Sequence, residues 1–313
     1  MQYSTTLRPT GRAKRRAVNL LAPLLALALA ACQSATPAPR QALAPPVAPV
    51  PYASYSAAST MAASGFLPFL GEAEPRGRST LVLDAASGSV LYEQDADALR
   101  FPASLTKLMT LQLLFDAIDA GRLSMTSVLH VSENAAGQPP SKLGIEAGGT
   151  LRVRDAIAAL SIKSCNDVAV VVAENLAGSE EAFAQMMNRR AAQLRMTRTR
   201  FTNASGLPDT AQVTTARDIA RLARNIRVQH RRYASYFRAT GLTYNGRELK
   251  ATNKLLGKVA GVDGMKTGYI RLSGYNLVTT ATRGGHDIIV VYFGGRTGAS
   301  RDAEVTTLVE RYL

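Results

Sequence analysis

Cysteine, histidine and aromatic residues are all scarce in this 313-residue chain, which has two cysteines, three histidines and no tryptophan. The histidines show no metal-ligand spacing, and no second cysteine stands near Cys165, so we expect neither a metal site nor a cofactor. Away from the N-terminus, no run approaches the ~18 apolar residues of a transmembrane helix. Most of the chain is therefore expected to be soluble.

Basic residues outnumber acidic ones, and the formal net charge is +14. Removing the five basic residues of the N-terminal 31 leaves about +9. The arginines between residues 189 and 224 recur at helical spacings with one aromatic among them, which favours solvated helix faces over a nucleic-acid surface. We expect no nucleic-acid partner, and the charge fits a polyanionic wall polymer better.

Residues 1–31 have the pattern of an export signal. Basic residues at positions 12–16 precede an uncharged stretch, 18–31, which contains the apolar run LLALALA. This stretch is shorter than the roughly 20 residues that span a bilayer, although a retained membrane anchor is the alternative. The segment ends in Leu29, two alanines and Cys32, which resembles the lipobox of bacterial lipoproteins.

That resemblance implies acylation of Cys32, and hence an exported, periplasmic protein attached to a membrane through an N-terminal lipid. Gln33 follows in place of aspartate, which in a two-membrane bacterium implies the outer membrane. Ordinary cleavage beside the alanines would instead leave a soluble protein. If Cys32 carries lipid, Cys165 has no disulfide partner within the chain and is a free thiol.

Composition divides the remainder in two. Residues 32–75 are mostly alanine, proline, serine and threonine without helical or strand period, and we expect a proline-stiffened linker. Residues 76–313 are long enough for one sizeable core or for two lobes that share a cleft. They form the expected folded domain.

Strand patterns lie at both ends of the folded part, and helical patterns lie between them. We expect strands at 79–84, 88–93, 275–282 and 287–295. Helical patterns cover 104–120, 152–164, 167–178, 180–195, 214–228 and 300–312. This order predicts an α/β fold of the α+β type, with one antiparallel sheet from both chain ends and an inserted helical lobe. The cleft between sheet and lobe is the expected site.

Three short polar motifs follow one another along the domain. Ser104 and Lys107 share a face at a predicted helix start, so hydroxyl and amine can meet, and a buried lysine can take the serine proton. Residues 164–166 (SCN) lie in a predicted loop and residues 266–268 (KTG) at a predicted strand start. S-x-x-K, S-x-N and K-T-G in this order are the signature set of penicillin-binding proteins and class A β-lactamases.

The surrounding segments FPASLTKLMT, SCNDVAV, VDGMKTGYIRLSGYNLV and FGGRT narrow the family further. Residues 76–313 resemble the low-molecular-mass penicillin-binding proteins, serine-type D-alanyl-D-alanine carboxypeptidases (peptidase S11-like). The resemblance implies a β-lactamase/transpeptidase-like fold and removal of the terminal D-alanine from peptidoglycan stem peptides through an acyl-enzyme. It also implies that β-lactam antibiotics acylate the enzyme.

By the same resemblance, the motif residues have defined roles. The catalytic ones are the nucleophile Ser104, the base Lys107, the proton relay Ser164, and Asn166, which orients the base and the substrate amide. The substrate-binding ones are Lys266, Thr267, Gly268, Tyr269 and Arg296. Among these, Thr267 and Arg296 would bind the terminal carboxylate, and the N–H groups of Ser104 and Tyr269 would form the oxyanion hole.

Cys165 departs from the family pattern, in which glycine usually occupies the middle of S-x-N. A side chain there could narrow the cleft or alter the deacylation of a β-lactam adduct. We interpret the thiol as a bystander between two functional neighbours, Ser164 and Asn166.

Three other functions stay open from the sequence. A DD-endopeptidase that opens peptidoglycan cross-links would use the same residues. A class A β-lactamase needs a glutamate beyond S-x-N to activate water; residues 195–212 contain none, so slow deacylation and inhibition by penicillin are expected. A catalytically silent wall-binding lipoprotein is the third alternative, and the complete motif set argues against it.

Overall fold

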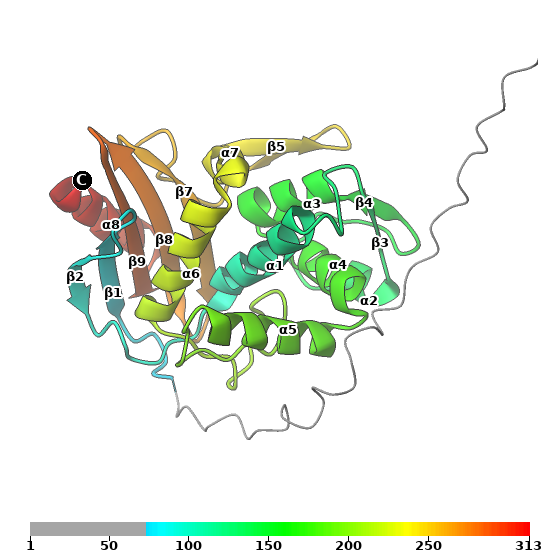
Figure 1. Cartoon of the computed structure of the whole chain (residues 1–313), viewed down its shortest axis with the longest axis horizontal. Coiled ribbons are helices and arrows are strands. Elements are labelled where there is room, and N and C mark those ends of the chain that lie inside the picture. The colour runs from blue at the N-terminus through cyan, green and yellow to red at the C-terminus, as the bar shows by residue number, and fades with distance from the viewer. Residues whose placement is uncertain (1–72) are drawn as a thin grey trace, which may run out of the picture. The chain divides into compact units, whose positions relative to one another are not determined.

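The computed structural model describes residues 73–313 and contains one five-stranded antiparallel sheet of order β2-β1-β9-β8-β7 (Figure 1). Its strands are β1 (Ser79–Asp84), β2 (Val90–Gln94), β7 (Val262–Ile270), β8 (Gly274–Arg283) and β9 (His286–Gly295). Because β1 pairs with β9, strands from the beginning and the end of the domain meet in one sheet. The predicted sheet is confirmed.

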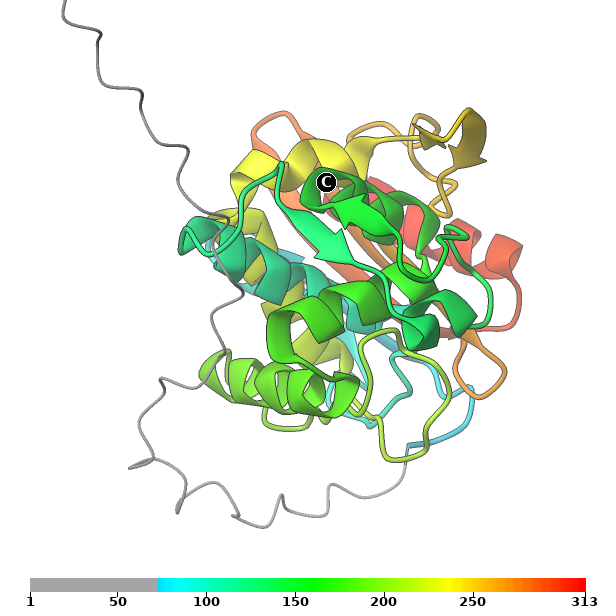
Figure 2. The same ribbon diagram turned by 90° about the vertical axis from the view of Figure 1, so that its right-hand side faces the viewer.

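A helical lobe is inserted between β2 and β7, again as predicted (Figures 1 and 2). Its helices are α1 (Lys107–Asp119), α2 (Glu133–Gly137), α3 (Val153–Ala158), α4 (Asn166–Ala177), α5 (Glu180–Gln193), α6 (Ala216–Gln229) and α7 (Ala234–Arg238). Helix α8 (Gly298–Tyr312) follows β9 and packs on the sheet.

The two faces of the sheet belong to different hydrophobic clusters. Leu81 and Val291 pack in the main core with the helical lobe, whereas their neighbours Val82 and Val290 pack in a second cluster with residues of α8. This alternation follows from the two-residue period of a strand. The sheet is therefore covered on both faces, which explains the unbroken apolar run at residues 288–293 of β9.

Helix starts follow the capping residues in the sequence. The hydroxyl of Ser179 accepts the N–H of Ala182 at 3.1 Å, so Ser179 is the N-cap of α5. Thr215 caps α6 in the same way through the N–H of Asp218. Each cap satisfies a backbone donor that has no partner within its helix.

Several elements differ in detail from the prediction. The helix expected over 104–120 begins as a 3₁₀ turn, Ala103–Thr106, and the helix expected over 152–164 ends in a π-helical turn, Ala159–Lys163. Two small two-stranded sheets were not predicted: β3 (Val128–His130) with β4 (Thr150–Arg152), and β5 (Gly241–Tyr244) with β6 (Arg247–Lys250). Strands of three or four residues are too short to show a clear period.

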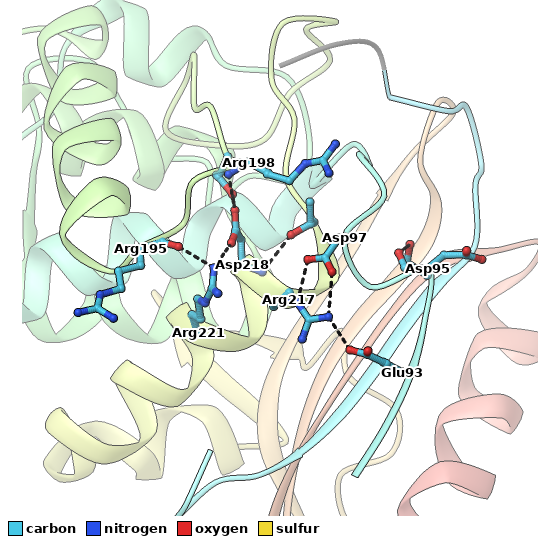
Figure 3. A network of polar contacts seen from close by, with 11 residues as sticks. Glu93, Asp95, Asp97, Arg195, Arg198, Arg217, Asp218 and Arg221 are labelled. Carbon is cyan, nitrogen blue, oxygen red and sulfur yellow. Dashed lines mark hydrogen bonds and ion pairs between the residues drawn. The ribbon is translucent and has the colours of Figure 1, made fainter. Parts of the chain in front are cut away.

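Ion pairs fasten the start of α6 to the edge of the sheet (Figure 3). Arg217 donates to both carboxylate oxygens of Asp97 at 2.8 Å and to Glu93 of β2 at 2.5 Å. These bonds raise the pKa of Arg217 and lower the pKa of Asp97. The contact fixes the helical lobe to the first hairpin.

No helix within residues 73–313 combines the length and the apolar character that crossing a bilayer requires. The predicted export signal (1–31), Cys32 and almost all of the predicted linker (32–75) lie outside the described residues. These predictions stay untested by the structure.

Candidate active site

Ser104 lies in the 3₁₀ turn that leads into α1, and Lys107, three residues later, is the first residue of α1. Such a turn has three residues per revolution, so the side chains of residues i and i+3 lie nearly in line. The Lys107 Nζ atom lies 3.2 Å from the Ser104 Oγ atom. The structure therefore brings the predicted nucleophile and base into hydrogen-bond distance.

The amine of Lys107 is completely buried among polar groups. Besides its contact with Ser104, Nζ donates to Asn166 Oδ1 at 2.7 Å and to the carbonyl of Ser205 at 2.5 Å. Burial, which disfavours the charged form, lowers the pKa of Lys107 to about 7. A neutral amine has two protons and one lone pair, so it can donate to Asn166 and Ser205 and still accept from Ser104.

The two ends of the SCN motif are positioned by different means. Ser164 follows the π-helical turn in a left-handed conformation, with φ of 66°, a kind of strain that is common at functional sites. The amide of Asn166 donates to the carbonyls of Pro139 and Pro140 at 2.9 and 3.1 Å. With its amide nitrogen fixed in this way, Asn166 presents Oδ1 to Lys107.

The side chain of Cys165 is buried in the main hydrophobic core and does not line the cavity described below. Burial raises the pKa of its thiol to about 12, so the thiol stays protonated and is a poor nucleophile at neutral pH. The side chain does not narrow the cleft. The geometry agrees with our interpretation of Cys165 as a bystander.

The KTG motif lies in the middle of the edge strand β7, not at its start as predicted. Lys266 is buried, and its Nζ donates to the carbonyl of Thr267 at 2.9 Å. The pKa of Lys266 lies well below its usual range. Burial is the main cause, and the nearby charge of Lys107 is the second. The hydroxyl of Thr267 donates to that of Thr252 at 2.8 Å.

Gly268 allows β7 to lie against the turn that carries Ser104. A Cβ atom at Gly268 would stand 3.1 Å from the carbonyl oxygen of Pro102 and 3.3 Å from the Ser104 nitrogen. A larger residue would push the strand away from the nucleophile. Tyr269 follows with 51% of its surface exposed, and its ring centroid lies 4.3 Å from that of Tyr275.

The loop 203–206 (NASG) completes the surroundings of Lys107. The carbonyl of Ser205 accepts from Lys107, and the side chain of Asn203 accepts from the backbone N–H of Gly206 at 2.7 Å. Glu180 of α5 accepts the N–H of Ala204 at 2.9 Å. Sequence motifs did not single out Glu180, because its contact is with backbone.

One cavity of about 470 Å³ joins these groups between the helical lobe and β7. Six of the predicted site residues line it: Ser104, Ser164, Asn166, Thr267, Gly268 and Tyr269. Lys107 and Lys266 are buried behind its wall. The predicted position of the cleft, between sheet and lobe, is correct.

The two arginines that follow β9 take opposite positions. Arg296 is exposed and does not line the cavity, so the structure does not place it beside Thr267. Arg301, in the first turns of α8, does line the cavity, and Asp302 Oδ1 accepts from its Nε and Nη2 at 2.9 and 2.6 Å. The sequence placed Arg301 in the helix predicted at 300–312 but gave no sign that it belongs to the site. Which face of that helix meets the cavity depends on tertiary packing.

Among residues 73–313, no group of three or more histidine, cysteine, aspartate or glutamate side chains is arranged to hold a metal ion. The absence of a metal or cofactor from the reaction stays a prediction.

Comparison with known proteins places this geometry in a family. The D-alanyl-D-alanine carboxypeptidase family, peptidase S11, matches residues 70–297. The D-alanyl-D-alanine carboxypeptidase DacF of Bacillus subtilis strain 168 is 34% identical over 242 residues, which are 74% of this chain and 61% of that protein. The chain thus spans about three fifths of the length of this relative.

Solved structures agree with the sequence match. The D-alanyl-D-alanine carboxypeptidase DacD from Francisella tularensis has a TM-score of 0.74 at 28% identity, covering 83% of this chain and 75% of that one. Penicillin-binding protein D2 from Listeria monocytogenes, in its ampicillin-bound form, has a TM-score of 0.66 at 32% identity, covering 76% and 98%. With its motifs gathered around one cavity, this chain belongs to the D-alanyl-D-alanine carboxypeptidase family, peptidase S11.

Proposed function

We propose that this protein is a serine-type D-alanyl-D-alanine carboxypeptidase that removes the terminal D-alanine from peptidoglycan stem peptides. The observation that carries the proposal is the contact of 3.2 Å between the Ser104 hydroxyl and the buried amine of Lys107, whose pKa is about 7. A hydroxyl beside such an amine can be deprotonated at neutral pH. The family and the cavity support the same conclusion.

In the proposed acylation step, neutral Lys107 takes the proton of Ser104 while Oγ attacks the carbonyl carbon between the two D-alanines. The N–H groups of Ser104 and Tyr269 stabilise the resulting oxyanion, and each such donor contributes roughly 3 kcal/mol in a well-studied protease. The close packing of Gly268 on the Ser104 turn supports this pairing. The tetrahedral intermediate then loses D-alanine, whose nitrogen takes a proton by way of Ser164.

The acyl-enzyme is then hydrolysed. Water attacks the ester carbonyl and gives its proton to Lys107, the ester C–O bond breaks, and Ser104 regains its proton. Asn166 keeps the amine of Lys107 aligned in both halves of the cycle through its bond of 2.7 Å.

We assign recognition of the terminal carboxylate to Arg301, together with Thr267, in place of the predicted Arg296. Arg301 lines the cavity and is held by Asp302, whereas Arg296 is outside it. A guanidinium binds a planar carboxylate through two parallel hydrogen bonds. Lys266 places an amine behind the same wall.

We also propose that β-lactam antibiotics acylate Ser104 and that the adduct is hydrolysed slowly. The ampicillin-bound structure of the Listeria protein supports acylation. Asp302, which is paired with Arg301, is the only acidic residue that lines the described cavity. No carboxylate of the cavity lining is thus available to activate water, and fast turnover of nitrocefin would contradict this proposal.

The decisive experiment incubates wild type and the Ser104→Ala variant with a pentapeptide ending in D-Ala-D-Ala and, separately, with cross-linked muropeptides. We expect wild type to release free D-alanine and the variant to release none. Cleavage of cross-linked dimers without D-alanine release would establish the DD-endopeptidase alternative. If neither substrate is cleaved, the enzyme proposal fails.

Export and lipidation are a separate part of the proposal. The leader pattern and the sequence around Cys32 support an outer-membrane lipoprotein in a two-membrane bacterium. Metabolic labelling with a fatty acid should mark wild type and leave the Cys32→Ala variant unlabelled. Equal labelling of both, or of neither, would exclude acylation at Cys32.

A further inference from the structure

A second cavity, of about 460 Å³, lies between the β1–β2 turn, the end of α5 and helix α6, and shares no lining residue with the cavity beside Ser104. The residues around it are Leu83, Ser87, Gly88, Gln193, Leu194, Arg195, Arg221, Arg224, Asn225, Val228 and Gln229. Three of the lining residues are arginines and none is acidic. We call it the arginine cavity.

The charge of the arginine cavity is only partly neutralised. Asp218 pairs with Arg221 at 2.8 Å, whereas Arg195 and Arg224 have no ion-pair partner among residues 73–313. A third cavity, of about 300 Å³, shows the contrast: there Arg227 lies between Asp263 and Asp287 and bonds both. The third cavity is lined by three arginines and two aspartates, so the arginine cavity, with three arginines and no acidic lining residue, has the larger excess of positive charge.

Backbone carbonyls hold two of the three guanidinium groups in place. Arg224 donates through Nε to Ala85 at 2.9 Å and through Nη2 to Ala86 at 2.5 Å. Arg221 donates through Nη1 to the carbonyl of Arg195 at 2.6 Å. Within the described residues, Nη1 of Arg224 and both Nε and Nη2 of Arg221 have no protein acceptor. Fixed donors of this kind lose little entropy when a ligand binds.

Arg195, which lies just after the end of α5, is the third arginine of the cavity. Its backbone is left-handed, with φ of 57°, and its carbonyl faces the Arg221 guanidinium (Figure 3). Its own side chain is exposed, extends away from Asp218 in that view, and makes no hydrogen bond to any described residue. It is the one arginine of the cavity without a structural contact of its own, which makes it the best residue to test.

We propose that the arginine cavity binds a phosphate-bearing ligand. A phosphate group carries a charge of about −1.5 to −2 and three acceptor oxygens, which matches two uncompensated arginines and a third with spare donors. A carboxylate, with one charge and two oxygens, would leave part of this set unused. The site is independent of the proposed peptidase activity.

The test titrates the full-length protein with inorganic tripolyphosphate in low-salt buffer and measures heat by calorimetry. We expect wild type to bind and the Arg195→Gln variant to bind about tenfold more weakly, as expected for the loss of one charge-assisted contact. Arg189→Gln is the matched control, because Arg189 is exposed, lies in the same helix end region and does not line the cavity. It should change the affinity less than about twofold, because isolated exposed charges contribute little.

Three results would overturn the proposal. The absence of binding by wild type would refute it directly, and equal weakening by Arg195→Gln and Arg189→Gln would leave only unspecific attraction. Binding that is lost in Arg301→Gln and kept in Arg195→Gln would place the anion beside Ser104. A second assay sediments the protein with vesicles that contain phosphatidylglycerol. If wild type sediments with the vesicles and Arg195→Gln does not, the phosphate belongs to a lipid headgroup. If the two proteins sediment to the same extent, the ligand is a soluble phosphate compound.

Discussion

Two basic side chains of the cavity beside Ser104, Lys107 and Arg301, are held in opposite ways. On the helical wall, Lys107 is bonded to neutral oxygens only, and burial brings its pKa to about 7. On the wall formed by β7 and α8, Arg301 is nearly as deeply buried, but its guanidinium lies against the carboxylate of Asp302. The amine can lose its proton, whereas the guanidinium keeps its charge.

The difference shows that burial alone does not set the role of a cationic side chain. Where the partners are amide and carbonyl oxygens, burial favours the neutral form and produces a base. A guanidinium is intrinsically far more basic than an amine, so a buried arginine paired with a carboxylate can bind an anion as a cation. We therefore expect changes on the helical wall to slow the chemical step and changes on the other wall to weaken substrate binding.

The largest effect is expected from Lys107→Gln. The variant keeps a polar side chain of similar reach but has no basic nitrogen, so acylation of Ser104 by a fluorescent penicillin should slow by about 10³-fold or more. Lys258→Gln, at an exposed lysine away from the cavity, is the control and should react like wild type. Acylation of Lys107→Gln within tenfold of wild type would show that another group is the base.

Arg301→Gln should act mainly on binding. Losing the guanidinium fork is expected to raise the KM for a D-Ala-D-Ala peptide by about 10- to 100-fold while kcat changes much less. Arg301→Lys, which keeps the charge and loses the fork, should fall in between. Arg296→Gln, the paired control, should leave KM unchanged; a larger effect at Arg296 than at Arg301 would restore the assignment made from sequence.

The pH dependence of acylation should reveal the pKa of Lys107. Because only the neutral amine accepts the serine proton and its pKa is about 7, the rate should fall about tenfold per pH unit below 7 and level off above it. Stopped-flow measurement with a penicillin whose own charge is constant between pH 5 and 9 would test this. A rate that still rises steeply from pH 8 to 9 would mean that the amine is charged at neutral pH.

The smallest effect is expected at Cys165. Because its side chain is in the core and not in the cavity, Cys165→Ala should change acylation by less than about twofold and lower the free energy of unfolding by about 1 kcal/mol, owing to the small void. Urea unfolding and penicillin labelling measure the two quantities. Loss of acylation in a variant that unfolds like wild type would mean that the thiol takes part in the reaction.

Much of the fold could be predicted because its signals are local. The unbroken apolar run at residues 288–293 marked β9, and apolar residues at helical spacing marked α1. The two-stranded sheets β3–β4 and β5–β6 were missed because strands of three or four residues are too short to show a pattern. The 3₁₀ turn at Ser104 was read as α-helix because both have i and i+3 on one face.

The sequence alone determined the order of the elements and the three motifs, since each depends on residue types at short and fixed spacings. Tertiary structure alone decided that Arg301 and not Arg296 lines the cavity, that Cys165 points into the core, and that Ser205 binds Lys107. It also gathered three arginines from α5 and α6 around a separate cavity. The physical reason is that the burial of a side chain, and its distance from residues far away in the chain, depend on how helices and strands pack against one another. The local spacing of residue types does not determine that packing.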